Sequence, residues 1–175
     1  MSGASREIVA YQNSLQRDPN DISLPPLIVF PESTTSNGTA LLRFYSGAFI
    51  SGLPVQPVLL RYAQSSTGFD VCWESVPISW HLGHLFCNSG IEAEVHYLPL
   101  YTPTQEEKSD PQLYARNVQA YMAEQLHVPA TSLSRLHKTA YHQRILSNQI
   151  RWTDHASRMR RQRYPAGESE RLLLL

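Results

Sequence analysis

The chain has 175 residues, of which 42% are hydrophobic and 17% charged, with 15 Lys and Arg against 15 Asp and Glu. This length predicts about one domain, and the apolar share supports a packed core and excludes wholesale disorder. Because the formal net charge is zero, no global field recruits nucleic acid or an anionic membrane, so any electrostatic role falls to local clusters.

The chain shows no sign of export or of a membrane span. No apolar stretch approaches the roughly 20 residues that cross a bilayer as a helix. The start, MSGASREIVAYQ, contains an acid and no long apolar segment, unlike a secretory signal. Two cysteines, Cys72 and Cys87, do not make a disulfide framework, which favours a reduced, cytosol-facing protein.

The first third of the chain predicts a polar segment and then a buried strand. Residues 1–24 are polar, with a short helical pattern around 6–15. Residues 27–30 have the sequence LIVF, a continuous apolar run typical of a strand buried on both faces. Pro31 ends this strand because it has no N–H to donate.

The middle of the chain predicts short elements. Residues 40–49 favour a short helix or turn. Residues 55–62, VQPVLLRY, predict a second buried strand, in which Pro57 indicates an edge or a bulge. Residues 80–87 look helical, and the alternation in residues 92–98, EAEVHYL, predicts a third strand.

The strongest helix signal follows. Asp110 is a suitable cap, Pro111 suits the first helical position, and six residues form one apolar face, namely Leu113, Tyr114, Val118, Tyr121, Met122 and Leu126. Residues 131–146 predict another helix. The sequence thus predicts an α/β fold, a mixed sheet with flanking helices, in residues 25–146, preceded by the polar segment 1–24 and followed by a basic, disordered tail, 147–175.

The loop after the first predicted strand is the candidate ligand site. Residues 30–38 have the sequence FPESTTSNG, and ligands of α/β sheets gather beyond the carboxyl ends of strands. Glu32 could accept hydrogen bonds from hydroxyl groups of a polyol-like substrate. Four residues add hydroxyls, Ser33, Thr34, Thr35 and Ser36, and Asn37-Gly38 supplies a turn. The alternative is a solvated Glu32 in ordinary turn chemistry.

A series of motifs resembles the glycerophospholipid acyltransferase family. Residues 30–34 resemble the family's third block, Phe-Pro-Glu-Gly-Thr, and residues 53–58, LPVQPV, resemble its fourth, Val-x-Pro-Val. Residues 59–62, LLRY, are similar to the lysophosphatidylcholine and lysophosphatidylethanolamine acyltransferase branch, as are four further stretches, 35–38, 47–58, 98–103 and 110–115. The resemblance covers roughly residues 27–146, the carboxyl-side part of such a domain.

The resemblance implies a reaction and its participants. Family members transfer an acyl chain from acyl-CoA, the co-substrate, to a lysophospholipid at the cytosolic side of the endoplasmic reticulum, without a cofactor. It implies a membrane surface but no nucleic acid as partner, and leaves the oligomeric state open. The implied substrate-binding residues are Glu32, Ser33, Thr34 and Thr35 of the third block with Val55, Pro57 and Arg61. Thr35 stands where relatives that use acidic acceptors carry Arg, which favours a choline or ethanolamine headgroup.

The chain departs from the family pattern at the catalytic base. Family members use a His-x-x-x-x-Asp pair as general base, yet none of the seven histidines has an Asp four or five residues later. We therefore expect a truncated chain without catalytic residues that does not turn over acyl-CoA alone. The alternative is a non-catalytic lipid-binding or interaction module derived from the family. A partial domain also predicts open strand edges and apolar faces.

Two smaller departures affect the candidate site. Ser33 replaces the glycine of the third block, where a side chain costs about 1 kcal/mol if φ is positive. Tyr45 stands where many relatives have Lys, so a cation able to meet a phosphate is lost.

Two competing sites rest on other residues. His81, His84 and Cys87 recur every three residues, with Cys72 upstream, and these residue types suit zinc; the alternative is a packed helix. The five arginines between Arg151 and Arg163 could contact anionic lipid headgroups; the alternative is a solvated tail. Neither a Gly-x-Ser-x-Gly motif nor a Gly-rich phosphate loop occurs.

Overall fold

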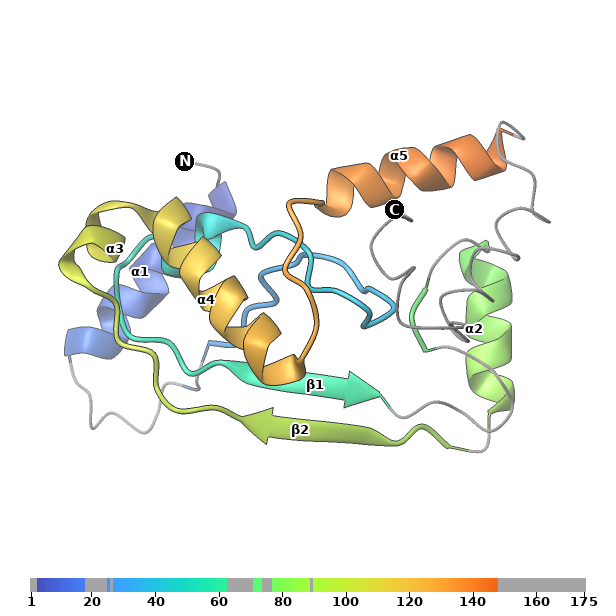
Figure 1. The fold of residues 1–175 in the computed structure, drawn as a ribbon, viewed down its shortest axis with the longest axis horizontal. Helices are drawn as coiled ribbons and strands as arrows, with labels where there is room; N and C mark the ends of the chain where they lie inside the picture. Colours follow the sequence, from blue (N-terminus) through green and yellow to red (C-terminus); the bar gives the residue numbers. More distant parts are fainter. Residues whose placement is uncertain are drawn as a thin grey trace. The chain divides into compact units, whose positions relative to one another are not determined.

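The fold is described from a computed structural model, which describes residues 3–17, 25, 27–62, 71–73, 77–88 and 90–147 (Figure 1). Contacts divide the chain into two units, Met1–Arg135 and Leu136–Leu175. The elements run in the order α1, η1, β1, α2, β2, α3, α4 and α5. The basic tail, from residue 148 on, lies outside the described residues.

The polar start of the chain forms a helix, as the pattern at residues 6–15 predicted. Helix α1 spans Gly3–Arg17. It contacts the 3-10 helix η1, Ser46–Phe49, where the side-chain amide of Gln12 donates to the carbonyl of Ala48 at 3.5 Å. Element η1 lies within residues 40–49, where a short helix or turn was predicted.

The prediction of a buried strand at residues 27–30 is wrong. These residues form no strand, and Ile28 and Phe30 are 75% and 73% exposed. The chain turns as soon as the apolar run ends, where the Ser33 N–H donates to the Phe30 carbonyl at 3.1 Å. Within the part of the chain that the structure describes, no strand pairs with this run.

The sheet of the described residues is a two-stranded antiparallel hairpin, β1 (Val58–Tyr62) and β2 (Ala93–Tyr97). The predicted strand at residues 92–98 is confirmed. The second predicted strand forms only from Val58, and its predicted burial is wrong, since within β1 only Leu59 is buried. The helices and this small sheet confirm the predicted mixed α/β character. They do not identify a particular α/β fold.

A bulge precedes the regular hairpin. Val58 pairs with Tyr97, but Val55 pairs with Tyr101, so three steps along one strand oppose four along the other. Pro57, which lacks an N–H, lies in this interval, and its carbonyl accepts from Leu98 N–H at 3.0 Å. The extra residue lies among residues 98–100 of the partner segment, opposite Pro57. The predicted irregularity at Pro57 is thus confirmed, with the bulge on the opposing strand.

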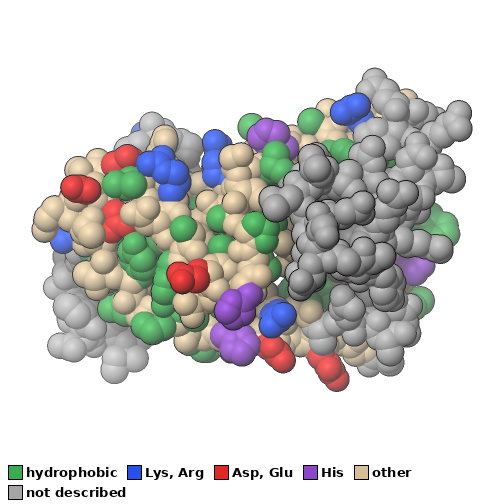
Figure 2. Space-filling model, in the orientation of Figure 1, with side chains coloured by type: hydrophobic (Ala, Val, Ile, Leu, Met, Phe, Trp, Pro, Cys, Tyr) green, Lys and Arg blue, Asp and Glu red, His purple; other side chains and the backbone are tan. Residues whose placement is uncertain are grey.

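One face of the hairpin is apolar and exposed. The register places Val58 opposite Tyr97 and Leu60 opposite Val95 on this face, and the four side chains are 38% to 73% exposed. The expectation of open apolar faces is met here. On the face drawn in Figure 2, basic and acidic side chains lie interspersed among the described residues.

Helix α4, Pro111–Leu126, organises the core of the first unit. Asp110 caps it by accepting from Gln112 N–H at 2.9 Å, with Pro111 in the first turn, as predicted. Its buried residues Tyr114, Ala115 and Val118 pack with Leu41, Phe44 and Phe49. The ring centroids of Phe49 and Tyr114 lie 4.9 Å apart in an edge-to-face contact.

Three further helices complete the description. Helix α2, Ile78–Cys87, confirms the helix predicted at residues 80–87. A short helix, α3, Gln105–Ser109, precedes α4. The helix predicted at residues 131–146 begins later, as α5, Arg135–Leu146.

Candidate functional site

The loop at residues 30–35 is fixed by bonds to residues 42–45. Ser33 closes a turn on Phe30, and the carbonyl of Pro31 accepts from Tyr45 N–H at 2.9 Å. The Glu32 carboxylate, half-buried, accepts from the Leu42 N–H at 2.9 Å. Glu32 is therefore held by the backbone of a neighbouring segment while it remains partly exposed.

Ser33 has the positive φ at which a residue other than glycine is strained. Its φ is +58°, in the left-handed region, where a residue with a Cβ carries a cost that glycine does not. The third block of the family has glycine at this place. Ser33 therefore occupies a backbone conformation to which glycine is better suited.

The rest of the loop is closed by its own side chains and by residues 72–73. The Asn37 side-chain oxygen accepts from Thr39 N–H at 3.2 Å, and Gly38 has φ of +74°, so the predicted Asn-Gly turn forms. The Thr35 hydroxyl donates to the Trp73 carbonyl at 3.5 Å. The Cys72 thiol donates to the Ser36 carbonyl.

Residues 41–45 are in turn held by α4 and by residues 129–133. Leu41 forms a parallel bridge with Ala130. The side-chain amide of Gln119, which is buried in α4, donates to three carbonyls, those of Leu41 (3.1 Å), Leu42 (2.9 Å) and Thr131 (3.0 Å). Sequence reasoning missed Gln119, because nothing local marks a polar residue as buried.

The residues predicted from the fourth block attach to a different part of the fold. Val55 and Tyr101 exchange backbone hydrogen bonds of 3.0 and 2.9 Å. The Tyr114 hydroxyl donates to the Leu53 carbonyl at 2.9 Å. Gly52, with φ of +63°, lies against α3, where an added Cβ would meet the Cα of Lys108 at 3.4 Å. Residues 52 and 53 are therefore held by α3 and α4, and Val55 is held by the backbone of Tyr101.

A buried carboxylate lies behind this segment. Glu107, 1% exposed, accepts hydrogen bonds of 2.7 Å from three donors, the Tyr101 hydroxyl, the Thr104 N–H and the Asn117 amide. Burial raises its pKa, but the hydrogen bonds from Thr104, Asn117 and Tyr101 outweigh burial, so the pKa lies below its usual 4.5. Thr104 and Glu107 form a capping box, and the Thr-x-x-Glu spacing was the signal that could have revealed it.

Arg61 lies apart from these two sets. It is exposed on β1, directly opposite Glu94 of β2 in the antiparallel register. An opposite charge at this cross-strand position is favourable for the hairpin. Of the predicted site residues, then, Glu32 to Thr35 share one loop, Val55 and Pro57 share the segment just before β1, and Arg61 lies further along β1.

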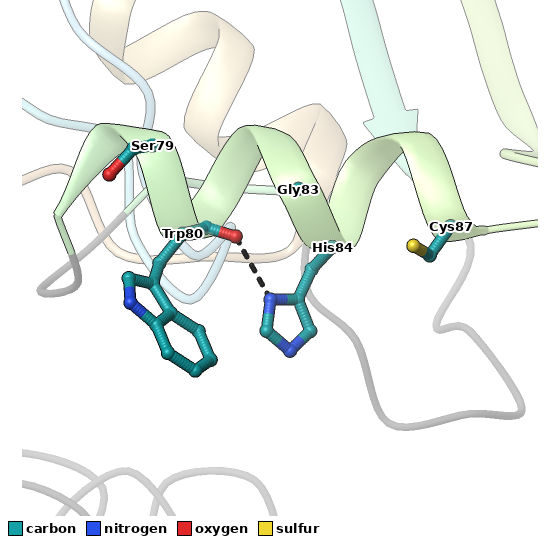
Figure 3. Close-up of a pocket in the computed structure, with 5 residues that line it drawn as sticks. All are labelled: Ser79, Trp80, Gly83, His84 and Cys87. Atoms are coloured by element: carbon teal, nitrogen blue, oxygen red, sulfur yellow. Dashed lines mark hydrogen bonds between the residues drawn. The ribbon is translucent and has the colours of Figure 1, made fainter.

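A concavity of about 570 Å³ runs along α2 and contains none of these residues (Figure 3). It is lined by Ser79, Trp80, Gly83, His84 and Cys87. The His84 Nδ1 lies 2.9 Å from the Trp80 carbonyl, so that nitrogen carries a proton, since a carbonyl only accepts. His84 and Cys87 are exposed, whereas His81 is buried.

Only one of the two alternative sites, the His and Cys group, lies within the described residues. Among them, no three His, Cys, Asp or Glu side chains lie close enough together to hold a metal ion. None of the described helices has the length and apolar character to cross a bilayer. The arginines of the predicted basic tail lie outside the described part of the chain.

Comparison with known proteins decides the family. Lysophospholipid acyltransferase LPEAT1 of Arabidopsis thaliana is 41% identical over 126 residues, which are 72% of this chain. The chain is a homologue of the lysophospholipid acyltransferases. Lysophospholipid acyltransferase LPCAT4 of Homo sapiens is 44% identical over 110 residues, and lysophosphatidylcholine acyltransferase 1 of Homo sapiens is 42% identical over 107, each match covering 61% of the chain. The resemblance read from the motifs is confirmed.

The chain matches only part of the length of these acyltransferases. It spans 31% of LPEAT1 and 20% of the two human proteins. No known protein-family profile and no solved structure matches the chain.

Proposed function

We propose that this chain provides the acceptor-binding part of a lysophospholipid acyltransferase. The reaction moves an acyl chain from acyl-CoA to the free hydroxyl of a lysophospholipid, at the cytosolic surface of the endoplasmic reticulum. The observation that carries the proposal is the 41% identity to LPEAT1 over 72% of the chain. Its chemistry needs no metal or cofactor from these residues, only a base for the attacking hydroxyl.

Glu32 is the central residue of the proposal. A carboxylate accepts hydrogen bonds at both oxygens, so it suits the hydroxyl groups of a glycerol backbone. The bond to Leu42 N–H at 2.9 Å orients it before a substrate arrives, which reduces the ordering cost of binding. Ser33, Thr34 and Thr35 supply hydroxyls beside it. Thr35, in place of a cation, favours a choline or ethanolamine headgroup over a bare phosphate.

A binding experiment tests this role. Monomeric lysophosphatidylcholine is titrated into the chain by calorimetry, with Glu32→Gln as the test variant, because the amide keeps an oxygen for Leu42 N–H but loses the charge. We expect about tenfold weaker binding, as for loss of one hydrogen bond to a charged group. Glu124→Gln is the matched control, an exposed acid on α4. Equal binding by the wild-type chain and both variants excludes Glu32 from the site.

A non-catalytic lipid-binding module is the second candidate. It is favoured by one observation, that no histidine of these 175 residues precedes Asp by four or five positions. We expect the chain to bind lysophosphatidylcholine without forming phospholipid from acyl-CoA. Product formation above a boiled control would show that these residues contain a base after all.

A further inference from the structure

Glu107 is a buried carboxylate whose burial needs an explanation. Capping boxes ordinarily lie at the surface, where the acid remains hydrated, and burial of an ionised group is costly. Here the side chain is 1% exposed, and the hydrogen bonds that compensate for its burial come from three uncharged donors. Among the described residues, no Lys or Arg forms an ion pair with it. A surface cap would start α3 equally well, so the buried position serves something beyond the helix start.

Three contacts lead from Glu107 to residues 52–55. Tyr101 donates its hydroxyl to Glu107 at 2.7 Å while its backbone pairs with Val55 in both directions. Tyr114 stacks on Tyr101, with ring centroids 5.7 Å apart, and its hydroxyl donates to the Leu53 carbonyl. The backbone of Lys108, the next residue in α3, packs against Gly52.

We propose that Glu107 is a positioning residue for residues 53–57. It does not touch the substrate. It fixes the Tyr101 ring, and through Tyr101 and Tyr114 it fixes the backbone from Leu53 to Val55, which in the proposed function lines the acceptor site beside Pro57. The proposal rests on that function for its consequence in binding, but the positioning itself is a property of the fold and can be measured separately.

Hydrogen exchange tests the positioning. The reporters are the N–H groups of Val55 and Tyr101, which bond to each other's carbonyls. Glu107→Gln places an amide nitrogen against at least one of the three donors, so both reporters should exchange about tenfold faster. Tyr114→Phe removes only the hydroxyl bonded to Leu53, and should accelerate Val55 more than Tyr101.

Ala123→Gly is the matched control. Ala123 is buried in the same helix as Tyr114, and glycine in a helix interior lowers stability about as much as a lost hydrogen bond. Exchange at Val55 and Tyr101 should not change in this variant under conditions where all the proteins are folded. Equal acceleration in all three variants would overturn the proposal, since it would show general destabilisation.

Lysophosphatidylcholine affinity supplies the second readout. Glu107→Gln and Tyr114→Phe should each weaken binding three- to tenfold, and Ala123→Gly should leave it unchanged. If exchange changes as predicted while affinity does not, residues 53–57 are positioned but do not contribute to binding, and the inference fails as a statement about the site. If the wild-type chain binds no lysophosphatidylcholine, the proposed function fails, and the exchange data still decide the positioning.

Discussion

Glu32 and Gln119 bind the same residue, Leu42, one at its N–H and the other at its carbonyl. The Leu42 N–H donates to the Glu32 carboxylate at 2.9 Å, and the Leu42 carbonyl accepts from the Gln119 amide at 2.9 Å. A buried residue of α4 therefore sets the position of the segment that orients Glu32. The candidate ligand loop is supported by the core rather than by its own turn alone.

Replacement of Gln119 by leucine should destabilise the first unit. The change removes the amide from the carbonyls of Leu42 and Thr131, while the Leu41 carbonyl keeps its bond from the Thr131 N–H. An unsatisfied buried polar group costs about 1–3 kcal/mol. Urea unfolding measures the loss. Gln125→Leu, at an exposed position of the same helix, should change stability by less than about 0.5 kcal/mol. Similar effects at the two positions would mean that the Gln119 bonds carry little energy.

Replacement of Ser33 by glycine should stabilise the chain. Ser33 has φ of +58°, and removing the Cβ relieves a strain of about 1 kcal/mol, offset in part by the greater freedom of glycine when unfolded. We expect a net gain of about 0.5 kcal/mol in the free energy of unfolding, measured in urea.

Two variants calibrate that measurement. The His127→Gly variant should gain a similar amount of stability, because His127 ends α4 with φ of +56°. Thr34→Gly, one residue along the loop, should lose stability, because its φ is not positive and only the entropic cost of glycine remains. A loss in Ser33→Gly comparable to that in Thr34→Gly would contradict the assigned backbone conformation.

Elements with local signals were predictable from the sequence. The cap at Asp110 followed by Pro111 fixed the start of α4, because capping depends on residues within one turn. The irregular pairing opposite Pro57 followed from its missing N–H in the same way. The candidate site loop was also chosen from the sequence, since FPESTTSNG is a contiguous motif, and its role in binding stays a prediction.

Contacts between distant residues were not predictable. The run at residues 27–30 looks like a buried strand, but burial requires partners, and a composition pattern does not show whether partners are present. Gln119 meets Leu41 across 78 residues, and only the fold shows that it is buried. Glu107 was missed although its spacing to Thr104 is a helix-start signal, because the link to Tyr101 and Asn117 is tertiary.

Acid should weaken the chain through Glu107. Its pKa in the folded state lies below 4.5, so the unfolded state binds the proton more tightly. Its contribution to stability is therefore present above about pH 4.5 and lost as the pH falls through the folded-state pKa. Urea unfolding between about pH 6 and 3 should show this loss in the wild type. Glu107→Gln should flatten the profile, whereas Glu106→Gln, at an exposed position in the same helix, should leave its slope unchanged.

Titration with alkali should reveal two tyrosines that ionise at a higher pH than ordinary tyrosines. Burial, the hydrogen bond to Glu107 and its negative charge raise the pKa of Tyr101 to about 12, and burial with the Glu107 charge raises the pKa of Tyr114 to about 12. The stability that both phenols contribute is thus complete below their ordinary pKa of 10 and is lost as the pH rises through 12. At about pH 11, absorbance at about 295 nm should report fewer ionised phenols in the folded chain than in urea, and Tyr101→Phe and Tyr114→Phe should each shrink that difference.

Glu107→Gln should lower the pKa of Tyr101 towards 10, because the charge that opposes a phenolate is gone. If Tyr101 and Tyr114 ionised near 10 in the folded protein, neither burial nor the Glu107 charge would be raising the pKa of these phenols.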